Sequence, residues 1–276
     1  MGTALIIIVF AALAVAGIYV FLIMPRVVDR ADMDMLTVDY AHRGLWGDKI
    51  PENSCPAFVR AVKGGYGIEL DIQLSKDNKI MVFHDYDLKR MCGIDKKLSE
   101  LTCAELKNIR LGNSEYTIPT LAEVLNLVDG RVPLLIELKG ESGDVRLCRI
   151  AAEMLDKYHG AFCVESFNPL LLRWFKKYRP RYARGQLVTK LNKKNRNGSA
   201  AVSFGLSHML FNLLSRPDFI AVDGKIRRSF MITVCKKAFG AKIFVWTVKN
   251  QKDYQICRKD GMHTIFEKII PQRTFK

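Results

Sequence analysis

Apolar residues follow two different patterns along the chain. No charged side chain occurs between Thr3 and Met24, a continuous run of 22 residues. As an α-helix this run is ~33 Å long, which is enough to cross a hydrocarbon core of ~30 Å. From Thr37 onward the pattern changes, because short β-branched runs alternate there with longer amphipathic stretches. The chain therefore divides into one helix of membrane-spanning length and a folded part that follows it.

The alternating pattern predicts a sheet that is covered by helices. The expected strands are Val38–His42, Gly67–Gln73, Ile80–His84, Val132–Lys139, Phe162–Ser166, Gly185–Thr189, Phe219–Val222, Lys242–Val248 and His263–Phe266. The expected helices are Cys55–Lys63, Thr120–Val128, Asp144–Tyr158, Pro169–Tyr178, Phe204–Leu214, Ser229–Phe239 and Lys252–Lys259. Strands that alternate with helices favour a parallel sheet in an α/β fold. About eight such units fit a closed TIM (β/α)₈ barrel.

Two further details bear on the domain organisation. Nine expected strands compete for eight places in the barrel, and Phe219–Val222 is the one that we expect to be irregular. No repeat and no Pro/Ser-rich linker divides residues 37–276, so we expect one barrel domain there. Residues 1–25 are then a transmembrane anchor, and residues 26–36 are a linker that keeps the barrel within ~40 Å of the bilayer.

A secretory signal peptide is the rival interpretation of the first segment, since Ala14-Val15-Ala16 resembles a small-residue cleavage site. No Lys or Arg precedes the apolar run, and cleavage would leave an apolar new terminus, so both features favour an uncleaved single span. Arg26 and Arg30 follow the span. The positive-inside rule therefore predicts a single-pass protein of the cell membrane with its larger domain in the cytoplasm.

Composition and charge narrow the class of protein. The 276 residues include 43 Lys and Arg against 28 Asp and Glu, and 49% are hydrophobic, which excludes a disordered chain. Basic residues gather around residues 173–196, within a stretch that has no acidic residue between Glu165 and Asp218. Beside a membrane span, we expect this surface to contact anionic lipid headgroups, and the sequence has no nucleic-acid-binding motif. The seven cysteines lack zinc-site spacing and indicate a reducing compartment.

Acidic residues gather near the ends of two expected strands. Side chains alternate along a strand, so Glu69 and Asp71 share one face of their strand, as do Glu137 and Lys139. Carboxylates that face the interior of a barrel are costly unless a cation or a proton offsets them. Three carboxylates suit a hard divalent cation, Mg²⁺ or Ca²⁺, which prefers oxygen ligands. The structural alternative is a buried ion-pair network of Glu137 with Lys139 or Arg43.

Two histidines favour a catalytic interpretation of this region. His42 and His84 both fall at the ends of expected strands, and each stands next to a charged residue. Two histidines beside three acids are typical of a general acid–base pair. His159, His208 and His263 have no such neighbours, and we expect them at the surface or at helix ends.

An ordered set of motifs resembles the glycerophosphodiester phosphodiesterase family. The motifs are His42-Arg43-Gly44, Pro51-Glu52-Asn53-Ser54, Glu69-Leu70-Asp71, His84-Asp85, Ile118-Pro119-Thr120-Leu121, Ile136-Glu137-Leu138-Lys139, Ser166-Phe167 and Val245-Trp246-Thr247-Val248. They extend over most of the chain after the linker and are densest from His42 to Lys139. An ordered set of this length is far more specific than His-Arg-Gly alone.

The resemblance implies a metal-dependent hydrolase that cleaves glycerophosphodiesters, or lysophospholipids, to a glycerol phosphate and an alcohol. The site residues that it implies are the metal ligands Glu69, Asp71 and Glu137, the acid–base histidines His42 and His84, and the substrate-binding residues Arg43, Lys139 and Trp246. One histidine would deprotonate the nucleophile while the other protonates the leaving oxygen. Together with the anchor, this resemblance makes a phospholipid-derived small molecule the expected substrate.

The chain departs from the family pattern at its last two strands. Lys249 follows Trp-Thr-Val where the family usually has Asn. The segment Gly261 to Lys268 lacks the usual aspartate, whose place is taken by Lys268, or by Glu267 if the alignment shifts by one residue. Both departures concern substrate contacts and leave the central motifs unchanged.

Two other functions compete with hydrolysis. Lys139 at the end of a barrel strand is also where a Schiff-base aldolase carries its lysine, although that chemistry gives no role to the three carboxylates and two histidines. The altered last strand is compatible with a membrane-tethered lipid- or protein-binding module on a catalytically impaired barrel.

Overall fold

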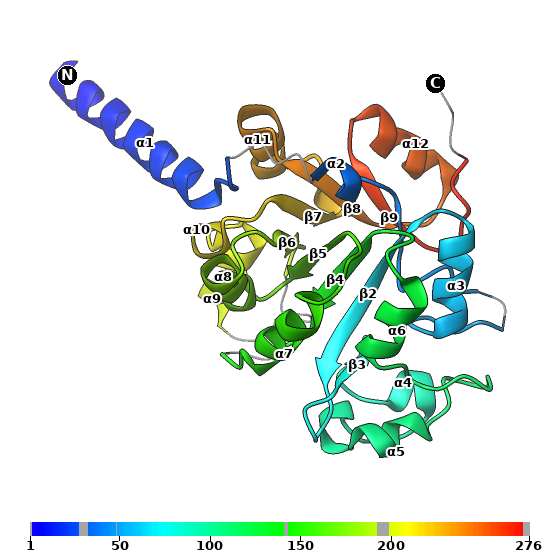
Figure 1. Cartoon of the computed structure of the whole chain (residues 1–276). Helices are drawn as coiled ribbons and strands as arrows, with labels where there is room; N and C mark the ends of the chain where they lie inside the picture. Colours follow the sequence, from blue (N-terminus) through cyan, green and yellow to red (C-terminus); the bar gives the residue numbers. More distant parts are fainter. Residues whose placement is uncertain (1, 28–32, 48, 141–142, 192–198, 273–276) are drawn as a thin grey trace.

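Eight parallel strands close into a barrel in the computed structural model, which describes residues 2–27, 33–47, 49–140, 143–191 and 199–272 (Figure 1). The barrel strands are β1 (Tyr40–Ala41), β2 (Gly67–Leu74), β4 (Leu134–Leu138), β5 (Phe162–Ser166), β6 (Ala183–Val188), β7 (Phe219–Asp223), β8 (Lys242–Val248) and β9 (His263–Phe266). Neighbouring strands are parallel, and β1 closes the ring by pairing with both β2 and β9. The predicted TIM barrel is confirmed.

The surplus strand is not the one that the sequence indicated. We expected Phe219–Val222 to be irregular, but it belongs to β7, which pairs in regular register with β6 and β8. The additional strand is β3 (Ile80–Val82), which pairs antiparallel with β2. The connection from β2 to β3 is a tight turn in which the Ser75 N–H donates to the Lys79 carbonyl. So short a connection permits only an antiparallel partner, since a parallel strand needs a long crossover.

Helices cover the outside of the barrel. They are α3 (Cys55–Lys63), α6 (Leu121–Val128), α7 (Arg146–Leu155), α8 (Pro169–Tyr178), α9 (Ala200–Ser207), α10 (Asn212–Ser215), α11 (Phe230–Phe239) and α12 (Gln251–Lys259), with a short 3-10 turn η2 (Gly224–Ile226) after β7. Side chains cap the starts of α3 and α6. The Ser54 hydroxyl accepts from the Ala57 N–H at the start of α3, and Thr120 and Glu123 form a capping box at α6.

An excursion follows β3 and extends beyond the carboxyl end of β2 (Figure 1). It contains α4 (Lys89–Cys92), the 3-10 turn η1 (Leu98–Glu100) and α5 (Cys103–Lys107). A small apolar cluster of its own, which includes Phe83, Leu88 and Leu106, holds the excursion together. The excursion matters for the site because it carries the segment directly after β3.

Two apolar layers fix the strands of the barrel. Between the sheet and the helices lie Ile68, Leu70 and Ile136, as the alternation predicts. Inside the barrel, large side chains such as Tyr40 and Phe244 form a second layer. Each such buried side chain contributes roughly 1.5–3 kcal/mol of hydrophobic free energy. Because this layer fills the amino end of the barrel, polar groups are left to the carboxyl end.

The N-terminal helix α1 (Gly2–Ile23) extends away from the barrel and is largely exposed (Figure 1). Its last residue is different: Ile23 is fully buried, and its carbonyl accepts from the Asn212 side-chain amide at 2.9 Å. Arg216 donates to the carbonyls of Phe21 and Met24, each at 2.9 Å. The end of α1 is therefore bonded to α10 and to the residue that follows it.

Part of the expected linker is packed against the barrel. Residues Met33–Leu36 form a short helix, α2, and both Met33 and Leu36 belong to the apolar layer inside the barrel. The Tyr40 hydroxyl donates to the Leu36 carbonyl at 2.8 Å. A four-residue helix shows no periodicity in a sequence, so only the tertiary contact reveals it. Residues 28–32 of the expected linker lie outside the described residues.

The basic stretch around residues 173–196 is only partly a surface. Arg184 is buried and lies 3.6 Å from Asp218, and Lys176 donates to two backbone carbonyls. Arg173 and Lys177 on α8 are exposed. The expectation of a basic surface is therefore wrong for Arg184, because its guanidinium donates instead to the carbonyls of Ser215 and Arg216 at the end of α10. Lys193, Lys194 and Arg196 lie outside the described residues.

Candidate active site

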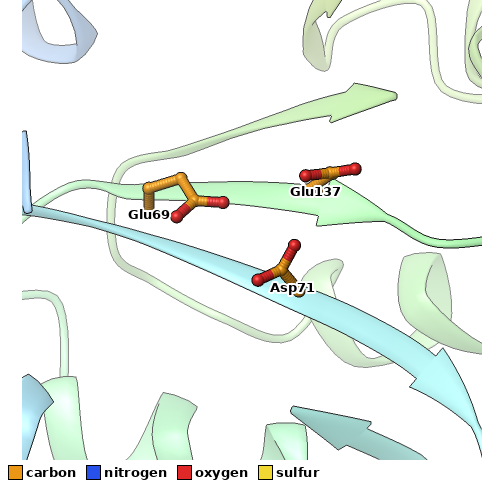
Figure 2. Close-up of side chains that lie close together, drawn as sticks. All are labelled: Glu69, Asp71 and Glu137. Carbon is orange, nitrogen blue, oxygen red and sulfur yellow. The ribbon is translucent and has the colours of Figure 1, made fainter. Parts of the chain in front are cut away.

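Three carboxylates on the adjacent strands β2 and β4 converge on one point (Figure 2). Glu69 and Asp71 alternate along β2, and Glu137 stands opposite Asp71 in the register of the β2–β4 pair. One oxygen from each of the three carboxylates lies within 4.8 Å of the others, and all three residues are buried. The three carboxylates that the sequence singled out therefore lie together, because strand alternation puts Glu69 and Asp71 on one face and the pairing of β2 with β4 adds Glu137.

Two cations lie against the carboxylate cluster. The Lys139 ammonium lies 2.8 Å from Glu137 and 3.1 Å from Asp71. The Arg43 backbone N–H donates to Glu69 at 2.8 Å, while its guanidinium lies 3.5 Å from Asp71. The ion-pair network weighed as a structural alternative is thus present. It surrounds the cluster and leaves a cavity beside it.

The electrostatics of the cluster favour an added cation. Burial raises the pKa of Glu69 well above its usual value, and the charges of Asp71 and Glu137 add to the rise. Burial also raises the pKa of Glu137 to about 7, against the pull of Lys139. The pKa of Asp71 is held low despite its burial, chiefly because Lys139 is adjacent. Local cations therefore leave part of the negative charge without compensation.

The donor set fits a divalent cation. All three candidate ligands are carboxylates that reach one point, which is the oxygen-only arrangement that Mg²⁺ and Ca²⁺ prefer. Coulomb attraction from a divalent ion would also favour the ionised forms of Glu69 and Glu137, which burial disfavours. The residues present thus suit a hard metal ion and give no reason to choose between magnesium and calcium.

His42 follows β1 and is held by a residue after the last strand. Its Nδ1 atom lies 2.7 Å from Oε2 of Glu267, and its Nε2 atom lies 4.0 Å from Oε2 of Glu69. Glu267 also forms an ion pair of 2.7 Å with Lys249. Despite its burial, Glu267 has its pKa lowered to about 2 by hydrogen bonds from His42 and Lys249. Burial lowers the pKa of His42, while its bond to Glu267 acts in the opposite sense.

The contact between Glu267 and His42 accounts for the two departures from the family pattern in the last two strands. Glu267, rather than Lys268, faces the site, and Lys249 lies against it. Lys268 has a positive φ of 60° and holds its ammonium 5.4 Å from the centre of the Trp46 ring. The two altered positions thus form one ion pair behind His42.

His84 reaches the site from outside the barrel ring. It is the second residue after β3. The residue between them, Phe83, donates its N–H to the Asp71 carbonyl at 2.9 Å. The Gln73 side-chain amide donates to the carbonyls of Phe83 and Asp85 and fixes the turn around His84. Nδ1 of His84 lies 2.6 Å from Oδ1 of Asp85. An antiparallel hairpin therefore delivers this histidine to the carboxyl end of β2.

A cavity of about 90 Å³ joins these groups. It is lined by both histidines, by Glu69 and Glu137, and by an aromatic wall of Phe167 and Trp246. The rings of Phe167 and Trp246 meet edge to face, with their centres 5.6 Å apart. The structure thus brings the predicted residue Trp246 to the same cavity as the histidines. Arg43 and Lys139 line it as well.

Sequence reasoning missed a fourth buried carboxylate and several supporting residues. Glu165 on β5 lines the cavity, and burial together with the charge of Glu137 raises its pKa well above the usual value. The alternation along Phe162–Ser166 was the signal that pointed to it. The Asn53 amide donates to Asp71 at 2.8 Å, and Glu52 binds the Arg43 guanidinium at 2.7 Å.

The remaining histidines lie away from this cavity. His159 is exposed, and His208 directly follows the last residue of α9, in agreement with the expectation of surface or helix-end positions. His263 is different, because it begins β9 and its ring lies 5.2 Å from that of Phe244, a residue of the layer inside the barrel. Burial lowers the pKa of His263 to about 4. The expectation for His263 was therefore wrong, because β9 turns its side chain inward.

A TIM barrel with a buried acidic triad and two carboxylate-bound histidines beside one cavity is an arrangement suited to a hydrolase, and comparison with known proteins identifies its class as the phosphoric diester hydrolases. The model of the glycerophosphoryl diester phosphodiesterase family matches residues 42–267. A glycerophosphodiester phosphodiesterase of Caldanaerobacter subterraneus is 30% identical over 244 residues, which cover 84% of this chain and 93% of that protein. The chain belongs to the glycerophosphoryl diester phosphodiesterase family and is an enzyme of this hydrolase type.

Solved structures agree with this assignment. The glycerophosphodiester phosphodiesterase of Thermotoga maritima has a TM-score of 0.64 and 28% identity over 83% of this chain and 94% of its own. An Oleispira antarctica phosphodiesterase, solved with its product sn-glycerol-3-phosphate, has a TM-score of 0.71 at 24% identity and covers 86% of this chain and 94% of its own. At that identity the second likeness supports the fold.

Proposed function

We propose that this enzyme hydrolyses glycerophosphodiesters, including lysophospholipids, with a divalent cation held by Glu69, Asp71 and Glu137. The observation that carries the proposal is the shared cavity: His42 and His84 line it together with Glu69 and Glu137. When bound, the cation would neutralise the phosphate and stabilise the charge that develops on its oxygens. Magnesium and calcium both match the oxygen donors.

The two histidines act as the acid–base pair. Each has Nδ1 hydrogen-bonded to a carboxylate, His42 to Glu267 and His84 to Asp85. This bond places a proton on Nδ1, so Nε2 is the atom left to accept or donate a proton in the reaction. One histidine removes a proton from the attacking hydroxyl or water, and the other protonates the oxygen of the departing alcohol. Net hydrolysis consumes one water and yields a glycerol phosphate and an alcohol.

The cations and the aromatic wall position the substrate. Arg43 and Lys139 line the cavity and present positive charge to the phosphate. Trp246 and Phe167 close one side, which limits the access of water. A Schiff base on Lys139 is disfavoured, because neighbouring carboxylates raise the pKa of its ammonium above the usual value, against the effect of burial. The intact histidine contacts likewise count against an impaired barrel that only binds.

Residues 1–25 serve as a membrane anchor in this proposal, and residues 37–276 form the catalytic domain on the cytoplasmic side. Within the described residues, α1 is the one helix that is long and apolar enough to cross a membrane, although a signal sequence passes the same test. N-terminal sequencing of the purified protein tests whether the helix is retained.

The test of the activity uses the full chain purified in mild detergent. We expect release of alcohol from glycerophosphocholine or glycerophosphoethanolamine, loss of activity in EDTA, and recovery when Mg²⁺ or Ca²⁺ is added. Asp71→Asn should not recover with either ion. No turnover of any glycerophosphodiester or lysophospholipid with metal present would refute the proposal.

A further inference from the structure

We propose that a groove beside the active site binds the acyl chain of a lysophospholipid, which α9 takes up from the bilayer surface. This inference rests on the proposed function and specifies where the acyl chain of a lysophospholipid binds and how that substrate enters. The groove has a volume of about 340 Å³ and begins at Glu137 and Lys139. Apolar side chains form the larger part of its lining, with Leu138, Phe167, Leu187, Leu191 and Leu206, while Tyr86, Ser166, Asn168 and Thr189 also line it.

The groove is continuous with the catalytic cavity. Glu137, Lys139, Phe167 and Leu187 line both spaces. A phosphodiester held beside the acidic cluster therefore has one of its ester substituents directed along the apolar walls. A glycerol that bears only hydroxyl groups would leave those walls uncovered. An acylated glycerol would bury them, which is favourable in proportion to the apolar area removed from water.

The helix that forms the outer wall of the groove also exposes apolar side chains. Leu206 of α9 lines the groove, while Val202 and Phe204 of the same helix are 43% and 58% exposed. Val202 lies one turn before Leu206 and so on the same face of α9, whereas Phe204 lies on the other face, where its ring stacks on that of His208 with centres 4.0 Å apart. Apolar side chains that stay exposed around one helix mark a contact with a lipid or another apolar surface. The short helix α9 therefore both lines the groove and exposes apolar side chains.

The same connection between β6 and β7 carries the docking site of the N-terminal helix. Asn212, which begins α10 five residues after the end of α9, bonds the Ile23 carbonyl, and Arg216 bonds Phe21 and Met24. If α1 crosses the bilayer, its last turn marks the membrane surface, and α9 lies close to it along the chain. Figure 1 shows α9, α8 and α10 grouped on the side of the barrel to which α1 is attached. The occupant of the groove is thus supplied by the membrane.

The reaction on such a substrate balances without a further reactant. Water, or an internal hydroxyl that is later replaced by water, attacks phosphorus, and the P–O bond to the headgroup alcohol breaks. The oxygen of water stays on the phosphate, and its proton passes through the histidines to the departing alkoxide. The products are an acylglycerol phosphate, whose chain remains in the groove, and the free headgroup alcohol.

The first experiment uses the full chain in lipid nanodiscs and measures choline release. The substrates are glycerophosphocholine and the lysophosphatidylcholines that carry a hexanoyl, octanoyl or decanoyl chain. Each lysophosphatidylcholine is used below its critical micelle concentration. We expect kcat/KM to rise with chain length, by at most about fourfold for each methylene buried in the groove. Leu206→Gln should lower kcat/KM for the decanoyl substrate at least tenfold and leave glycerophosphocholine within twofold.

The second experiment tests the route from the bilayer. The double variant Val202→Ser, Phe204→Ser should lower turnover of oleoyl-lysophosphatidylcholine embedded in vesicles about fivefold or more, with the hexanoyl substrate unchanged. The matched control is Ile270→Ser, which removes an apolar side chain that is 65% exposed and lies outside the groove. The control should behave as wild type with every substrate.

The outcomes separate this inference from the proposed function. Hydrolysis of glycerophosphocholine with no gain from an acyl chain, or equal losses on all substrates in Leu206→Gln, overturns the inference and leaves the proposed function standing. No turnover of any of these substrates overturns both. Retained glycerophosphocholine hydrolysis in each variant shows that it is folded.

Discussion

Oε2 of Glu267 lies 2.7 Å from Nδ1 of His42, so a residue after the last strand holds the histidine that follows the first strand. The contact is possible because β1 pairs with both β2 and β9 and closes the ring. The His84–Asp85 contact of 2.6 Å is its local counterpart. Both histidines thus have Nδ1 occupied by a carboxylate, by a distant partner in one case and an adjacent one in the other.

Loss of the Glu267 carboxylate should impair the orientation of His42. For Glu267→Gln we expect kcat to fall on the order of 10–100-fold with little change in KM, less than the ~10²–10⁴ that an acid–base group contributes. Steady-state hydrolysis of glycerophosphocholine measures this. Lys268→Ala is the matched control, since Lys268 lies over Trp46, and it should stay within twofold. Equal kcat for Glu267→Gln and wild type would contradict a positioning role.

Removal of either histidine should abolish most of the turnover. We expect His42→Ala and His84→Ala each to lower kcat by ~10²–10⁴, because each loses one proton transfer. His159→Ala, at an exposed position, should leave kcat unchanged. Circular dichroism should show the wild-type spectrum for all three variants. Activity of His84→Ala above a tenth of wild type would show that the hairpin histidine takes no part in the reaction.

Metal binding should weaken as the pH falls through about 7. In the metal-free protein the pKa of Glu137 is raised to about 7, so below that pH a cation must displace its proton. The apparent affinity should fall by up to about tenfold for each pH unit below 7. Titration of Mg²⁺ or Ca²⁺ at pH 6, 7 and 8, followed by the shift in Tm, measures the effect.

The raised pKa of Glu137 also determines whether the stability of the metal-free protein rises or falls with pH. A carboxyl whose pKa is higher in the folded than in the unfolded protein destabilises the fold once it ionises, so metal-free stability falls between about pH 4.5 and 7. Glu137→Gln should remove this part of the slope. Saturating divalent cation should raise the Tm of wild type at pH 8 and have no such effect on Asp71→Asn. A metal-independent Tm in wild type would count against the metal site.

The attachment of α1 should contribute to the stability of the barrel. Asn212→Ala leaves the buried Ile23 carbonyl without its side-chain donor, and we expect the free energy of unfolding to fall by ~1–3 kcal/mol. Denaturant unfolding of the full chain in micelles measures the change. Gln255→Ala on the exposed face of α12 should change it by less than ~0.5 kcal/mol. Identical curves for Asn212→Ala and wild type would show that the contact is not maintained in micelles.

The sequence by itself determined the features that depend on neighbours along the chain. The alternation of Glu69 and Asp71 puts both on one face of a strand, whatever lies around it. The caps at Ser54 and Thr120 likewise involve partners only three residues further along the chain, Ala57 and Glu123. The apolar run of α1 predicts a helix, and the repeated strand–helix pattern predicts the barrel class. Both patterns depend on residues that are close together along the chain.

Only the tertiary structure decided which distant segments meet. The pairing of β9 with β1 brings Glu267 to His42, and the hairpin of β2 with β3 brings His84 to the acidic cluster. The burial of Ile23 and Leu36 likewise depends on surfaces formed by residues far along the chain. Local preferences act over a few residues, whereas these contacts follow from closure of the ring and from burial of apolar surface. The hydrophobic periodicity of the sequence therefore does not indicate which distant strands pair to close the ring or which apolar surfaces become buried.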